Sequence, residues 1–170
     1  GNESGMSERC EAPPVPPGPT PVIGAVEHDT TWYAGASPYV LEGTVVGRDT
    51  AALVIEPGTE IISKGGPLII EGRVRAAGDE AHLIRFRGEN GSPWEGVAFQ
   101  NVKEKENVLS QCRITEAARG ITCRSSSPVI ERCEVTDNEV GMLIGDSFSK
   151  PVIRNCVIRR NSAAGMVIEN

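Results

Sequence analysis

Acidic side chains in the C-terminal half are the residues of this chain best suited to acid–base chemistry. The carboxylates are Asp137, Asp146, Glu116 and Glu139, and the arginines that could act as a base beside them are Arg119 and Arg159. General acid–base catalysis needs two such groups held across one substrate bond. The spacing of these residues does not define such a pair, and solvated turn residues explain them better.

Other catalytic motifs are missing from the sequence. It contains no nucleophile elbow, no P-loop and no dinucleotide fingerprint, and its only histidines are His28 and His82. We therefore expect no catalytic site, no cofactor and no metal ion.

The five cysteines do not form the framework of a small disulfide-bonded protein. Cys112, Cys133 and Cys156 are 21 and 23 residues apart and occupy equivalent positions of a repeat. A column of small buried side chains explains this better than a metal or redox site, because no C-x-x-C pair or Cys/His cluster occurs. Cys10 lies in a polar segment, so we expect it to be the accessible thiol, open to intermolecular contact.

The segments that would hold these residues repeat along the chain. Each copy has an aliphatic residue, a cysteine three positions later and a second aliphatic residue two positions further on; the copies are Leu109–Ile114, Ile130–Val135 and Ile153–Ile158. A glycine then opens an alternating strand, at positions 120, 141 and 165, and a fourth such strand opens at Gly96. A period of about 20 to 25 residues is typical of a solenoid, whose coils bury their apolar sides by stacking.

Side-chain alternation assigns the faces of each coil. The expected inner columns are Leu109/Ile130/Ile153, Ile114/Val135/Ile158 and Phe99/Cys123/Ile144/Ile168, and the expected half-exposed outer column is Ala98/Thr122/Leu143/Val167. Three inner columns predict three parallel strands per coil, and so an all-β parallel β-helix of five to six coils over residues 32–170. We expect the aligned glycines where the backbone takes a positive φ or packs too closely for a side chain.

The first 31 residues read as a separate extended arm. Six prolines stand within residues 11–21. They exclude helix and central strand and favour polyproline II. The arm is either a tether or a segment that lies along a neighbour or over an open edge of the solenoid.

The repeats resemble those of the right-handed parallel β-helix, pectin-lyase-like superfamily. The resemblance is carried by 128–138 and 151–161, each running on to Gly-Met, by the opening segment from Trp32 to Ile61, and by Trp94-Glu-Gly. It covers roughly residues 32–170, and the opening segment is similar to bacterial secreted and surface proteins of this type. Trp32 and Trp94 resemble structural tryptophans of the family, although either could be a sugar-stacking platform.

The resemblance implies a fold more specifically than an activity, because this scaffold carries lyases, hydrolases, epimerases, adhesins and inert spacers. The Asn-Thr-Asp, Asp-Asp, Gly-His-Gly and Arg-Ile-Lys set that polygalacturonases share does not occur here. Neither histidine has the context found in alginate epimerases. Pectate lyases need several acidic Ca²⁺ ligands on neighbouring coils and a basic arginine, and the acids named above form only a loose collection.

The composition and the N-terminal sequence limit which partners and which cellular location we expect. The net charge is −6 without a basic stripe, which argues against nucleic acid, and no apolar run is long enough to span a membrane. An acidic surface would also repel a polyanion unless Ca²⁺ bridged the two. The N-terminus has no signal-like segment, so either the chain is not exported or its signal has been removed. Position 1 is not Met, which favours processing or an engineered start, and we expect a secreted or cell-surface protein whose signal has been removed.

The predicted ends of the solenoid suggest how it could act. Three arrangements fit these ends: an excerpt of a longer solenoid, an arm folded over one edge, or head-to-tail stacking of copies into filaments. The residues expected at the stacking surfaces are Tyr39, Leu41, Met166 and Ile168. The sequence thus favours a non-enzymatic structural or interaction protein of the cell exterior, whose partners are copies of itself or other surface components. The alternative is a carbohydrate-binding or polysaccharide-processing module.

Overall fold

The protein is built almost entirely of short β-strands. The computed structural model describes residues 16–102 and 106–169, and within these ranges the only helical elements are two 3₁₀ turns, Ala34–Ala36 and Glu89–Gly91. One sheet has twelve strands: β1 (Thr20–Val26), β3 (Tyr39–Gly47), β5 (Glu60–Ser63), β6 (Leu68–Ile70), β8 (Ile84–Gly88), β9 (Val97–Gln100), β11 (Cys112–Ile114), β12 (Arg119–Arg124), β14 (Glu134–Thr136), β15 (Val140–Ile144), β17 (Val157–Arg159) and β18 (Ala164–Ile168). The other has six: β2 (Thr30–Trp32), β4 (Ala52–Ile55), β7 (Arg73–Ala77), β10 (Val108–Ser110), β13 (Val129–Glu131) and β16 (Val152–Arg154).

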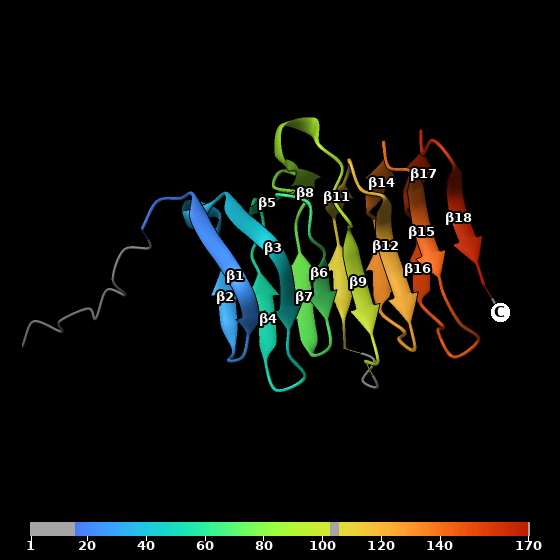
Figure 1. Ribbon diagram of the computed structural model, residues 1–170, viewed down its shortest axis with the longest axis horizontal. Helices are drawn as coiled ribbons and strands as arrows, with labels where there is room; N and C mark the ends of the chain where they lie inside the picture. The colour runs from blue at the N-terminus through green and yellow to red at the C-terminus, as the bar shows by residue number, and fades with distance from the viewer. Residues whose placement is uncertain (1–15, 103–105, 170) are drawn as a thin grey trace, which may run out of the picture.

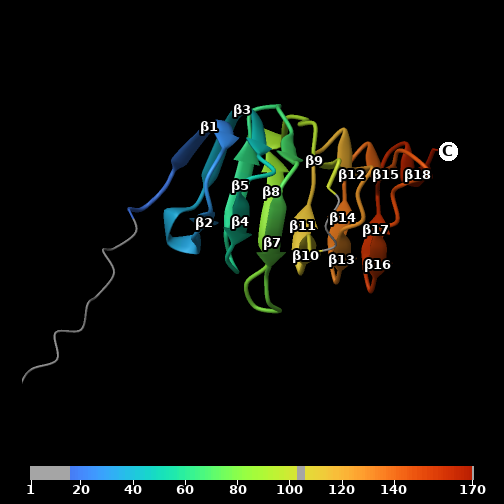
Figure 2. The same cartoon turned by 90° about the horizontal axis from the view of Figure 1, so that it is seen from below.

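These strands wind into six stacked coils (Figure 1). Each coil takes one strand from the six-stranded sheet and then two from the twelve-stranded sheet; in the first coil these two are the halves of the bent strand β3. Every strand pairs in parallel with its equivalent in the next coil, and Figure 2 shows the six-stranded sheet along one side of the stack. The predicted all-β parallel β-solenoid of three strands per coil is confirmed.

The inner columns form the core. Leu109 aligns with Ile130 and Ile153, and Ile114 aligns with Val135 and Ile158, as predicted. Members of the fourth and fifth coils are fully buried, whereas those of the sixth are half-buried. A coil therefore buries its apolar side through the neighbours on both of its faces.

The outer column is less exposed than expected at two positions. Thr122 and Leu143 are only 8% and 6% exposed, although they point away from the core. The side chains of Arg119 and Arg124 border the same shallow depression. The aliphatic stems of such long side chains can shield an outward residue from water.

The aligned glycines are required mainly by close packing. Gly96 alone of the four has a positive φ, of 97°. A Cβ atom on Gly141 would lie 2.4 Å from the carbonyl oxygen of Gly165 in the next coil. The second of our two explanations, an approach too close for a side chain, therefore accounts for Gly141.

The predicted boundary between arm and solenoid, at residues 31/32, lies too late in the chain. Thr20–Val26 forms β1, which pairs in parallel with β3, and Thr30–Trp32 forms β2, which pairs with β4. Prolines hid this strand from the sequence pattern, but an edge strand tolerates proline where the nitrogen faces away from its partner. The rest of the predicted arm, residues 1–15, lies outside the described residues.

Candidate functional site

Three successive corners of the solenoid bring the candidate acids together. Between the two strands that each coil contributes to the twelve-stranded sheet, the chain turns through one left-handed residue, which is Glu116, Asp137 or Arg160, with φ of 62°, 60° and 54°. These residues border a surface groove of about 590 Å³ that Glu139 also lines. The structure thus places three of the four proposed carboxylates at one groove.

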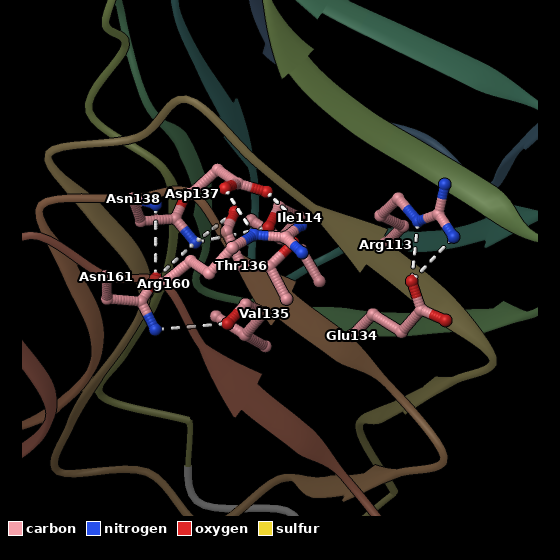
Figure 3. Close-up of polar contacts among 9 residues, drawn as sticks. All are labelled: Arg113, Ile114, Glu134, Val135, Thr136, Asp137, Asn138, Arg160 and Asn161. Carbon is pink, nitrogen blue, oxygen red and sulfur yellow. Dashed lines mark hydrogen bonds and ion pairs between the residues drawn. The ribbon is translucent and has the colours of Figure 1, made fainter.

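An asparagine ladder supports the floor of this groove (Figure 3). Oδ1 of Asn138 accepts a hydrogen bond from the backbone N–H of Ala117 at 2.9 Å, and Oδ1 of Asn161 accepts one from the N–H of Asn138 at 3.1 Å. Nδ2 of Asn138 donates to the carbonyl oxygens of Ile114 and Thr136, both at 3.1 Å. This ladder closes backbone hydrogen bonds at successive corners of the solenoid.

Asp137 is held by an arginine that sequence reasoning missed. Nε and Nη2 of Arg160 donate to its two carboxylate oxygens, each at 2.8 Å (Figure 3). This hydrogen-bonded guanidinium lowers the pKa of Asp137 to about 2. Asp137 is therefore ionised and paired at neutral pH, which does not suit a proton shuttle. The offset of 23 residues between Asp137 and Arg160, equal to one coil, was the signal that could have revealed the pair.

Two of the other proposed residues, Glu116 and Arg119, also make structural contacts. Glu116 accepts a hydrogen bond from the N–H of Gly88 at 3.1 Å, whereas Glu139 is exposed. Arg119 lies 3.9 Å from a carboxylate oxygen of Glu95, and Arg159 forms no ion pair with any other described residue.

Asp146 lies apart from the groove, in the loop between β15 and β16. Its Oδ2 accepts hydrogen bonds from the N–H and hydroxyl of Ser125, and its Oδ1 accepts from the N–H of Phe148 and from the N–H and hydroxyl of Ser149. Five donors on one carboxylate mark a loop-closing residue.

Ion pairs connect neighbouring coils over the outer surface. They include Arg48–Glu71, Lys64–Glu42, Arg87–Glu60, Arg113–Glu134 and Arg154–Glu131. Each is partly or fully solvated, so each contributes little to stability. No group of three or more His, Cys, Asp or Glu side chains is arranged to hold a metal within the described ranges.

Comparison with protein families matches residues 54–170 to the family described as "Right handed beta helix region". This chain belongs to the right-handed β-helix family. Comparisons with curated proteins and with solved structures found no significant match. Among residues 16–102 and 106–169, no helical segment is long and apolar enough to cross a membrane.

The cysteines of this β-helix are packing residues. Cys112 and Cys133 are buried and unpaired, and their sulfur atoms approach the backbone carbonyls of Ala76 and Leu109 at 3.6 and 3.4 Å. The neighbouring Cys112 thiol and burial raise the pKa of Cys133 to about 12, which suppresses the reactive thiolate. Cys156 occupies the same column in the half-buried sixth coil, and Cys10 lies outside the described residues.

Both tryptophans are buried rather than presented to a ligand. Trp32 stacks on Tyr39 with ring centroids 4.9 Å apart, and Nε1 of Trp94 donates to the carbonyl oxygen of Thr115 at 2.8 Å. Their resemblance to structural tryptophans therefore describes them better than sugar stacking does.

The residues predicted to meet in head-to-tail stacking differ in solvent exposure between the two ends. Met166 and Ile168 are 40% and 67% exposed on the last strand. Tyr39 and Leu41 are instead buried, because β1 pairs with β3 and covers them. A second copy cannot stack on these two residues, so this part of the predicted assembly surface is wrong.

Proposed function

We propose that this β-helix is a non-enzymatic scaffold of the cell exterior, one that presents a stable surface to other components. The observation that carries the proposal is that Asp137, the best candidate for an acid catalyst, is already bound by an arginine. Asp137 is bound by two guanidinium nitrogens, Nε and Nη2, of Arg160 in the next coil, so its ionised form serves cohesion between coils. The exterior location follows the resemblance to secreted and surface proteins. We do not include filaments built through Tyr39 and Leu41, because β1 occupies that position.

The proposal is tested by assaying the purified protein on polygalacturonate and alginate, with and without Ca²⁺. We expect no unsaturated products or new reducing ends beyond those of a heat-killed sample. Activity that disappears in Asp137→Asn and persists in Asp49→Asn, an exposed residue on another coil, would overturn the proposal and locate a site at the groove.

A second candidate function, binding of an acidic polysaccharide, is favoured by a different surface. A groove of about 700 Å³ crosses the outer face of the six-stranded sheet, and Val54, Arg75 and Val108 align across it on adjacent strands. Arg73 and Arg75 are exposed there and form no ion pair with any side chain in 16–102 or 106–169. Two arginines beside partly exposed valines suit a carboxylated sugar, because carboxylates pair with guanidinium and sugar rings pack on apolar side chains. Glu106 and Glu131 also line the groove, and Glu131 is paired with Arg154.

This candidate is tested by affinity electrophoresis in polygalacturonate at low ionic strength. The double variant Arg73→Ala/Arg75→Ala should lose retardation, whereas Arg85→Ala, which removes one exposed charge from the other sheet, should retain most of it. Migration of the parent protein that does not respond to the polymer would exclude this function.

A further inference from the structure

The short turn between β8 and β9 contains the one Asn-Gly pair of this sequence, Asn90-Gly91. Both residues are exposed, and the turn belongs to the third coil, which has a neighbouring coil on each side. An asparagine followed by glycine is well placed to react with its own main chain, because glycine has no Cβ atom to shield its backbone nitrogen. This turn is therefore a candidate for chemistry that the chain performs on itself.

The reaction is an attack by the backbone nitrogen of Gly91 on Cγ of Asn90. The new N–Cγ bond closes a cyclic imide, a succinimide, while the bond from Cγ to the side-chain nitrogen breaks. That nitrogen leaves as ammonia and takes the amide proton of Gly91 with it. Water then opens the imide at one of its carbonyl carbons. Opening at Cγ gives aspartate, and opening at the main-chain carbonyl gives isoaspartate, so solvent water is the only co-reactant.

The folded turn restrains this attack. Asn90 has a φ of 51° and a ψ of 33°. At this ψ, its Cβ and the nitrogen of Gly91 lie on opposite sides of the Cα–C bond, whereas closure of the imide needs them on the same side. The required rotation opens the turn, which is held by a hydrogen bond of 2.9 Å from the N–H of Ser92 to the carbonyl oxygen of Glu89. Such local opening costs less free energy than unfolding of the whole protein, so it occurs in the native state.

Other asparagines lack this combination of features, since none of them is followed by glycine. Asn107 and Asn138 are also buried and accept hydrogen bonds from backbone N–H groups. Asn101 is the closest match, because it is exposed and has a positive φ of 54°. It is followed by Val102, whose branched side chain shields the backbone nitrogen. Asn101 therefore serves as an internal comparison.

We propose that Asn90 is a site of self-modification, at which the chain forms a succinimide and releases ammonia to leave aspartate or isoaspartate. Either product adds a negative charge beside the groove that Gly91, Pro93 and Glu116 line. Isoaspartate also lengthens the main chain by one methylene group within a turn whose two ends are fixed in β8 and β9. The proposal goes beyond the scaffold function and holds whether or not the protein binds a polymer.

The test incubates the purified full chain in a mildly alkaline buffer and follows deamidation by mass spectrometry. Trypsin cleaves after Arg87 and Lys103, so Asn90 and Asn101 lie on one peptide and fragmentation distinguishes them. Asn90 should convert about tenfold faster than Asn101 or more, because glycine leaves its nitrogen accessible and valine does not. Labelling by an isoaspartyl methyltransferase should locate isoaspartate at position 90. The proposal is overturned if Asn90 converts no faster than Asn101.

Two further measurements connect the chemistry to the turn. In urea, Asn90 should convert faster than in the native protein, because the rotation no longer breaks the turn; a lead over Asn101 that appears only in urea would overturn the proposal for the folded chain. The variant Asn90→Asp carries the charge of the product on an ordinary main chain. It should fold like the parent and lose most of the ammonia release, and release equal to that of the parent would contradict the assignment to Asn90.

Discussion

The fifth and sixth coils carry the same residue types at several equivalent positions, yet these residues have different surroundings. Ile130 is 0% exposed and Asn138 is buried, whereas their equivalents Ile153 and Asn161 are half-buried. A Cβ atom on Gly141 would meet a backbone oxygen at 2.4 Å, but on Gly165 the nearest atom is the Cγ2 of Ile158, at 3.5 Å. The alternation of the sequence shows whether a residue faces the core or the outside. Coverage by the next coil determines how much a substitution at that residue lowers the free energy of unfolding.

The largest difference is expected for a charge placed in the inner column. Ile130→Asp would bury an unpaired carboxylate, which should reduce the free energy of unfolding by about 4 kcal/mol or more. Ile153→Asp leaves the carboxylate partly hydrated, and its cost should be about 1–2 kcal/mol. Urea-unfolding midpoints of the two variants measure this, and equal midpoints would contradict the role of the sixth coil in covering the fifth.

The glycine column should show the next largest contrast. Gly141→Ala forces a methyl group against the backbone of the sixth coil and should cost about 3 kcal/mol. Gly165→Ala, which meets only the edge of a side chain, should change stability by less than about 0.5 kcal/mol. Thermal melts followed by circular dichroism are sufficient, and similar melting temperatures would show that the coils can separate without cost at this corner.

The asparagine ladder provides a smaller contrast. Asn138→Ala removes the acceptor of the buried Ala117 N–H and the donor to Ile114, so it should cost about 2 kcal/mol. Asn161→Ala should cost about 1 kcal/mol or less, because water reaches this corner of the sixth coil. Hydrogen exchange at Ala117 should accelerate in the first variant only; unchanged exchange would mean that the Asn138 side chain does not protect this group.

The smallest effect concerns the ion pair that joins the two coils. The pKa of Asp137 is about 2, below the ordinary value of 3.8, so folding favours the ionised form of this side chain. The contribution of the Asp137–Arg160 pair to the free energy of unfolding is therefore present above a pH of about 4 and is lost as the pH falls toward 2. Asp137→Asn should lower the melting temperature slightly at pH 7, and the difference from the parent should disappear near pH 2. Asp49→Asn serves as the control, and a difference that persists at pH 2 would assign the effect to something other than ionisation.

Much of the architecture could be predicted because a solenoid repeats its contacts at a constant offset. Leu109, Ile130 and Ile153 differ little in their neighbours, so alternation within one coil and spacing between coils determine their positions together. The asparagines of the ladder were predictable for the same reason. The pairing of Asp137 with Arg160 follows the same offset, but the corner residue changes its side-chain type from coil to coil, so the offset was the only signal for this pair.

The sequence by itself determined the all-β class, the three strands per coil and the inner columns, because these follow from periods that every coil repeats. Only the tertiary structure decided that Thr20–Val26 covers the first coil and buries Tyr39 and Leu41. That segment occurs once, contains Pro21 and has a shifted register with β3, so no repeated sequence pattern predicts it. Its conformation is set by the exposed edge it covers, and that edge exists only once the other coils have formed.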